Sequence, residues 1–167
     1  MHSDLVNVLR SKVTGVDRVL IVGLGNVLRG DDGLGIYVAR KLKRSLRGSN
    51  NVKVLVCEGG LENSLDIVLK YKPKCLIIID AVYREGDEPG SIYLLSEGDL
   101  ASNVGTLSTH YIPLSDLIKM IRSYIDVEVL VIGIQVKNVE VGIGLSDEVL
   151  RASNYVVETI EKAIKNQ

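Results

Sequence analysis

Several residue types that fill most protein cores are missing from this chain of 167 residues. It contains no Phe and no Trp, and only two Cys and two His. Its hydrophobic residues are mostly Val, Ile and Leu, so we expect an aliphatic core that favours buried strands. The chain is long enough to bury such a core, which excludes the need for a disulfide or a structural metal. Cys57 and Cys75 lie in apolar runs, where we expect reduced thiols that act as small hydrophobic groups.

An excess of charge of one sign is absent as well. Twenty basic residues stand against 21 acidic ones, and no run of like charge occurs. Nucleic acids and anionic membranes attract proteins through basic patches, so we expect neither as a partner. Asp4 and Arg10 interrupt the apolar residues of the N-terminal segment, which excludes a signal peptide, and no stretch is suited to spanning a membrane. These absences predict a soluble, cytoplasmic protein.

What the chain does contain is an alternation of strand-like and helix-like segments. The apolar runs 19–22 and 75–79 are typical of strands covered on both faces. We expect a further buried strand at 127–133 and another strand at 52–57. Helical patterns follow these runs at 33–46, 61–71, 113–124 and 146–165. The short run 91–95 predicts an antiparallel edge strand or hairpin arm.

This order predicts an α/β fold. We expect a three-layer α/β/α sandwich around a mostly parallel, twisted sheet of about five strands. Residues 1–17 form an N-terminal extension in which Leu5, Leu9 and Val13 have helical spacing. Residues 18–167 form a single domain.

Polar residues of a kind that carries chemistry follow the predicted strands. Asp31 and Asp32 come after the first strand and its glycine loop, Asp80 ends the third strand, and His110 follows the long polar segment 96–109. Ligands of an open parallel sheet bind outside the carboxyl ends of its strands, where the strand order reverses. If the order is 2-1-3, Asp32 and Asp80 face each other across an exposed crevice, and the loop delivers His110 to the same edge.

Two carboxylates and an imidazole can bind a late first-row divalent metal or transfer protons. Taken singly, these residues have ordinary alternatives. Asp31 or Asp32 suits a helix N-cap, Asp80 a turn, and His110 a hydrogen-bonded loop position. Gly59 and Gly60 suit a tight turn as well as a substrate-contacting loop.

Two other classes of protein share parts of this pattern. Gly23 and Gly25 invite a dinucleotide-binding interpretation, and Glu58 stands where a ribose-binding acid would, but the third glycine of that motif falls on Leu28. The second class is the phospho-receiver domain or another non-enzymatic binding module, with Asp80 as acceptor and Lys137 as charge partner. In receivers the acidic pair follows the strand directly, whereas here residues 23–30 intervene.

Three segments together resemble the hydrogenase maturation endopeptidases: 23–35, 79–81 and 108–110. These enzymes trim the C-terminal tail of a [NiFe]-hydrogenase large subunit. The resemblance implies an endopeptidase whose partner is the large-subunit precursor, and whose metal is Ni²⁺ carried by that substrate, with Zn²⁺ or another late first-row ion able to substitute. It places Asp32, Asp80 and His110 on the metal-binding and catalytic positions.

The resemblance also implies a set of residues near the substrate: Gly25, Asn26, Asp31, Gly59, Gly60 and Gln135. The chain departs from the usual motifs at Glu58 and Leu61, where Asp and Thr are common, and at Val136, where Pro often follows the Gln. These departures concern substrate choice.

Further expectations concern the metal. Replacing Asp32, Asp80 or His110 singly by Ala should remove metal binding and processing at little cost in stability, because an exposed edge is predicted. Metal binding should weaken below about pH 6.5, where an unperturbed imidazole becomes protonated.

Overall fold

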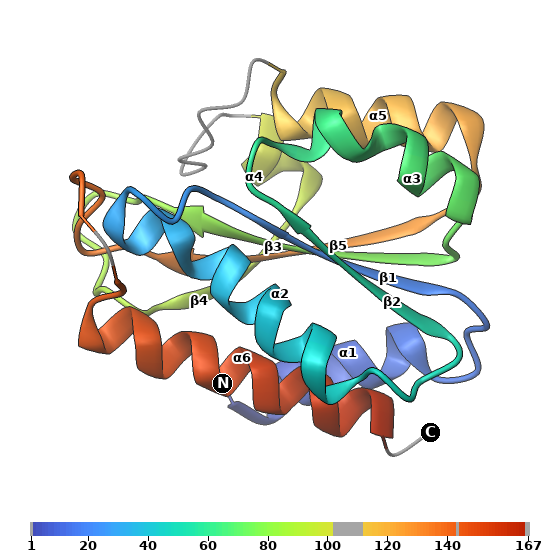
Figure 1. The fold of residues 1–167 in the computed structure, drawn as a ribbon, viewed down its shortest axis with the longest axis horizontal. Coiled ribbons are helices and arrows are strands. Elements are labelled where there is room, and N and C mark those ends of the chain that lie inside the picture. Colours follow the sequence, from blue (N-terminus) through green and yellow to red (C-terminus); the bar gives the residue numbers. More distant parts are fainter. Residues whose placement is uncertain (1, 102–111, 143, 166–167) are drawn as a thin grey trace.

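A single five-stranded sheet forms the centre of the computed structural model, which describes residues 2–101, 112–142 and 144–165 (Figure 1). Its strands are β1 (Val19–Leu24), β2 (Val52–Cys57), β3 (Cys75–Val82), β4 (Ile92–Leu95) and β5 (Glu128–Gln135). They lie in the order β2-β1-β3-β5-β4. All neighbours are parallel except β4, which pairs antiparallel with β5 at the edge. The predicted 2-1-3 order and the antiparallel edge strand are confirmed.

Helices cover both faces of the sheet and complete the predicted three layers (Figure 1). On one face lie α1 (His2–Val13), α2 (Leu34–Ser45) and α6 (Asp147–Lys165), and on the other α3 (Leu65–Tyr71), α4 (Glu97–Ala101) and α5 (Leu114–Tyr124). The 3-10 turns η1 (Gly30–Gly33) and η2 (Leu61–Ser64) precede α2 and α3. Within the described ranges, no helix combines the length and apolar character needed to cross a membrane.

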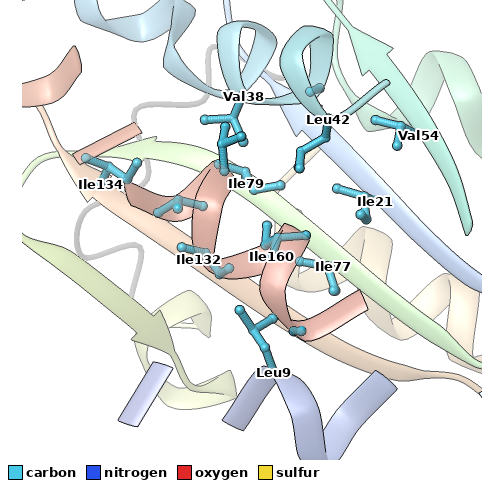
Figure 2. Close-up of a cluster of buried hydrophobic side chains, with 14 of the residues drawn as sticks. Leu9, Ile21, Val38, Leu42, Val54, Ile77, Ile79, Ile132, Ile134 and Ile160 are labelled. Carbon is cyan, nitrogen blue, oxygen red and sulfur yellow. The ribbon is translucent and has the colours of Figure 1, made fainter. Parts of the chain in front are cut away.

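The core consists of aliphatic side chains that alternate between the two faces of the sheet. Figure 2 shows one cluster, in which isoleucines of β1, β3 and β5 meet Val38 and Leu42 of α2, Leu9 of α1 and Ile160 of α6. Leu20, Val22 and their neighbours form a second cluster on the other face. Because successive side chains of a strand point to opposite faces, uninterrupted apolar runs fill both clusters. Both cysteines are buried and free, as predicted.

The N-terminal segment is part of this core. Leu5, Leu9 and Val13 of α1 are buried in the first cluster, and α1 packs against α6. Lys12 forms an ion pair with Glu128 at the start of β5. The helical spacing of three apolar residues therefore corresponds to a packed helix.

Two details of the prediction were wrong. Residues 97–101, assigned to a loop, form α4, which begins with a reciprocal cap: the Ser96 hydroxyl accepts the Asp99 N–H at 3.2 Å and the Asp99 carboxylate accepts the Ser96 N–H at 2.9 Å. In addition, β3 does not end at Asp80. It continues to Val82, because β5 pairs with it as far as Gln135.

Candidate functional site

Asp32 and Asp80 lie at the point where the strand order reverses, between β1 and β3. The last pairing of β1 with β3 joins Gly23 to Ile79, so Asp80 is the next residue of β3 beyond it. The turn η1, which carries Asp32, packs against β3. Gly35 permits the close approach of α2 to β1 and β3. A Cβ at this position would stand 2.2 Å from the Leu24 carbonyl oxygen and 2.5 Å from that of Ile79.

The predicted exposure of this edge was wrong. Asp32 is 4% exposed and Asp80 1%. The cause is tertiary: β3 continues past Asp80 along β5, and η1 packs against β3. The two carboxylates therefore lie together in a buried position, where charge is costly unless it is compensated.

Asp80 is only partly compensated. Its Oδ1 accepts the N–H of Ala81 at 2.9 Å, while its buried Oδ2 has no hydrogen-bond partner among the described residues. Burial raises the pKa of Asp80 to about 7; the Ala81 hydrogen bond opposes this rise, and the nearby Asp32 carboxylate adds to it. Such a group can hold a proton near neutral pH or exchange it for a cation.

His110, the third predicted ligand, lies outside the described residues. Within the described part of the chain, no three metal-ligating side chains come together. The helix α4, which precedes the segment with His110, is tied to the end of β3 by an ion pair of 3.0 Å between Arg84 and Asp99. The Asp32–Asp80 pair is in place, and the three-ligand set stays a prediction.

Asp31 has a different surrounding from its neighbour. Its carboxylate accepts the N–H groups of Lys137 and Asn138, each at 2.9 Å, the N–H of Ser146 at 2.6 Å and the Ser146 hydroxyl at 2.9 Å. It caps neither η1 nor α2. With both oxygens occupied by the protein, Asp31 fixes the loop after β5 to the loop after β1, and this role was not predicted.

Gly25 and Asn26 shape the loop that leads to Asp32. Gly25 has a φ of +138°, and a Cβ there would stand 1.9 Å from the Asp32 carbonyl oxygen. Asn26 donates its N–H to that carbonyl at 3.2 Å, and its side-chain oxygen accepts the Leu28 N–H at 2.9 Å. The loop is therefore a tight one whose geometry requires glycine at position 25.

The remaining predicted substrate residues also have partners within the protein. The Gln135 amide is buried and pairs with the backbone of Arg84, accepting its N–H at 2.9 Å and donating to its carbonyl at 3.0 Å. Gly60, with a φ of 100°, begins η2. Gly59 is exposed, and its carbonyl accepts a hydrogen bond of 2.7 Å from the Asn63 amide.

The residues that suggested other classes are engaged elsewhere. Glu58, the candidate ribose-binding acid, forms an ion pair with Arg40 of α2. Lys137, the candidate charge partner of a phospho-receiver, donates to Glu148 of α6 at 2.8 Å. Glu58 is therefore not placed as a ribose-binding acid, and Lys137 is not placed as the charge partner of a phospho-acceptor.

Comparison with known proteins decides the family. The model of the hydrogenase maturation proteases, HycI type, matches residues 36–163. The chain belongs to the hydrogenase maturation protease family. A putative hydrogenase maturation protease of Methanocaldococcus jannaschii is 31% identical over 163 residues, which cover 94% of each chain. The hydrogenase 3 maturation protease of Escherichia coli is 32% identical over 118 residues, covering 70% of this chain and 71% of that one.

Solved structures of hydrogenase maturation proteases share the fold. The crystal structure of the [NiFe] hydrogenase maturation protease HycI from Thermococcus kodakarensis matches with a TM-score of 0.82 at 28% identity, covering 95% of this chain and 99% of that one. The solution structure of the endopeptidase HycI from Escherichia coli matches with a TM-score of 0.71, also at 28% identity, covering 86% and 89%. The resemblance seen in the sequence motifs is confirmed.

One part of the surface was missed by sequence analysis. A groove of about 360 Å³ runs along α2, and its wall includes Tyr37, Arg40, Lys41 and Arg44. The sequence contains a pattern that predicts this surface, because these four residues recur at helical spacing opposite the buried face of α2.

Proposed function

We propose that this protein is an endopeptidase that removes the C-terminal extension of a [NiFe]-hydrogenase large-subunit precursor after nickel insertion. Family membership supports a protease of hydrogenase maturation. The observation that carries the finer proposal is the buried Asp80 oxygen without a hydrogen-bond partner in the described residues, beside the carboxylate of Asp32. An unpaired buried acceptor is costly, so its presence argues for a ligand that completes the site.

In this proposal the ligand is the nickel that the precursor carries. Asp32, Asp80 and His110 would hold it, because carboxylate and imidazole groups together suit late first-row ions, and Zn²⁺ could substitute. The ion would polarise the scissile carbonyl as a Lewis acid. Asp80, which burial keeps partly protonated near pH 7, would release its proton when the cation arrives.

The cysteines support a mechanism without a protein nucleophile. Burial raises the pKa of both thiols, that of Cys75 to about 11, so neither is a thiolate at neutral pH. Both thiols are buried, Cys57 as the last residue of β2 and Cys75 as the first residue of β3. Water is then the nucleophile of the proposed hydrolysis.

The decisive experiment compares processing of nickel-loaded and nickel-free precursor. We expect the wild-type protein to shorten only the nickel-loaded precursor, as read by mass spectrometry of the product. Asp80→Asn should slow this by about 10² to 10³, the usual loss when one electrostatic group of an active site is removed. Asp126→Asn is the matched control. The Asp126 carboxylate is 99% exposed, and it lies just before β5, at the end of the strands opposite to Asp80. Full activity of Asp80→Asn would refute the proposed site.

The role of His110 has a separate test. Calorimetric titration of Ni²⁺ into the wild-type protein and His110→Ala should show weaker binding by the variant. Titration with Mg²⁺ should give little binding in either protein, because Mg²⁺ prefers oxygen ligands. Equal affinity of both proteins for Ni²⁺ would exclude His110 as a ligand.

The phospho-receiver alternative makes an opposite prediction. It requires Asp80 to take up phosphate from a small phosphodonor in the presence of Mg²⁺. We expect the intact mass of the protein to stay unchanged under these conditions. A stoichiometric gain of one phosphate would favour the receiver.

A further inference from the structure

The groove along α2 begins beside the proposed site. Gly33, which follows Asp32 directly, lies in its wall, and the groove extends along α2 to Arg44. At 1.5 Å per residue this helix segment spans about 16 Å. An extended peptide advances about 3.3 Å per residue, so about five residues fit along it.

The wall of the groove is apolar near the site and basic farther away. Val27 contributes apolar surface beside Gly33, Leu145 is a second apolar residue of the wall, and none of the described residues in the wall carries a carboxylate. Tyr37 forms the middle, where its hydroxyl donates to the Asn154 amide oxygen at 2.9 Å. The far part is formed by cationic side chains of α2.

These cations differ in how far the protein neutralises them. Arg40 is paired with Glu58. Lys41 donates to the neutral amide of Asn154 at 2.7 Å and lies 5.2 Å from the centre of the Tyr37 ring, with Glu161 close enough to feel its charge. Arg44 is exposed at the end of the groove. Positive charge is therefore left over at the far end.

We infer that this groove binds the first residues of the precursor's C-terminal tail, as an extended segment with an apolar side chain near the cut and carboxylates farther along. The inference rests on the proposed function, because it takes Asp32 and Asp80 as the site of cleavage. The apolar wall beside Gly33 fits the apolar side chain, and Lys41 and Arg44 fit the carboxylates.

The test uses charge reversal with a matched control. Lys41→Glu/Arg44→Glu changes the groove, whereas Lys43→Glu/Arg47→Glu makes the same change in charge at exposed positions of the same region that do not line it. The probe is a fluorescent synthetic peptide of the precursor tail, starting at the residue after the cut. We expect the groove variant to bind it about tenfold more weakly in anisotropy measurements, and the control to bind within about twofold of wild type.

Kinetics give a second readout. With the nickel-loaded precursor, the groove variant should show a KM about tenfold higher and an unchanged kcat, because the contact is made in the ground state and the transition state alike. A tail peptide with Asn and Gln in place of its Asp and Glu should bind wild type as weakly as the original peptide binds the variant. If the control double variant bound the peptide as weakly as the groove variant, the inference would be overturned. The loss of affinity would then come from long-range attraction between charges and not from contacts in the groove.

The two proposals fail in different ways. If the precursor is processed but the tail peptide does not bind, or if groove and control variants behave alike, the groove inference is wrong and the protease function stands. If the peptide binding depends on Lys41 and Arg44 but no precursor is cleaved, the proposed function is wrong and the groove stands as a peptide site.

Discussion

Asp31 and Asp80 are two carboxylates of one protein that are buried to the same degree, each 1% exposed, yet the regions around them are built in opposite ways. Around Asp31, the loop after β5 supplies four donors, and both oxygens are occupied. Around Asp80, the strand supplies one donor, and Oδ2 has no partner in the described residues. Burial alone thus does not identify a functional acid. The two carboxylates differ in their donors, and this difference is the reason why we propose Asp80, and not Asp31, as a ligand of the metal.

The largest effect we expect comes from removing the saturated carboxylate. Asp31→Ala leaves four donors in a partly buried loop junction without their buried acceptor, and loss of one member of a buried charged network typically costs 3 to 5 kcal/mol. We expect the free energy of unfolding, measured by urea denaturation, to fall by about 4 kcal/mol. A loss below about 1 kcal/mol would mean that water replaces the carboxylate freely and that the contrast with Asp80 is false.

The unsaturated carboxylate should respond in the opposite direction. Asp80→Asn removes a charge that burial disfavours, so we expect the metal-free protein to gain about 2 kcal/mol of stability at pH 8, although processing is lost. The gain depends on pH. Since the pKa of Asp80 is raised from 3.8 to about 7 on folding, the folded state binds more protons than the unfolded state within this window.

The contribution of Asp80 to the free energy of unfolding therefore falls as pH rises from about 4 to 7. The advantage of Asp80→Asn should be full above pH 7 and nearly absent at pH 4. Urea denaturation of both proteins in a chelator at four pH values measures it. An advantage that is independent of pH would show that the gain has another cause than charge.

The two buried thiols extend the comparison of Asp31 with Asp80, because they too are titratable groups inside the core. Cys57→Ala and Cys75→Ala should each cost about 1 kcal/mol of stability through lost packing, and both should process the precursor at the wild-type rate. Loss of processing in a variant that keeps its far-UV circular dichroism would make that thiol part of the chemistry.

The smallest effect belongs to the exposed ion pair. Lys137 and Glu148 are 53% and 34% exposed in their side chains. Lys137→Ala should change the free energy of unfolding by less than about 0.5 kcal/mol, since exposed pairs contribute little. The backbone N–H that Lys137 gives to Asp31 is kept in this variant, so a large loss would mean that the side chain also supports the loop.

The contrast between Asp31 and Asp80 also explains what the sequence could predict. Apolar runs and their spacing are local, and they predicted the strands, the crossover helices and the edge that carries Asp32 and Asp80. The donors around Asp31 come from positions more than 100 residues away, and no local pattern announces them. The extension of β3 beyond Ile79 likewise depends on its partner β5, so the burial of Asp80 could not be read from its own neighbours.

The junction at Asp31 has a consequence for how the protein is made. Its donors lie 106 to 115 residues later in the chain, the last of them at Ser146, close to the start of α6. During synthesis the turn with Asp31 leaves the ribosome more than 100 residues before its partners do. The hydrogen bonds of Asp31, next to Asp32, can be completed only after Ser146 has been translated. A copy truncated before Lys137 has the carboxylate of Asp31 but none of its four donors, so one buried charge makes the loop after β1 depend on residues more than 100 positions later.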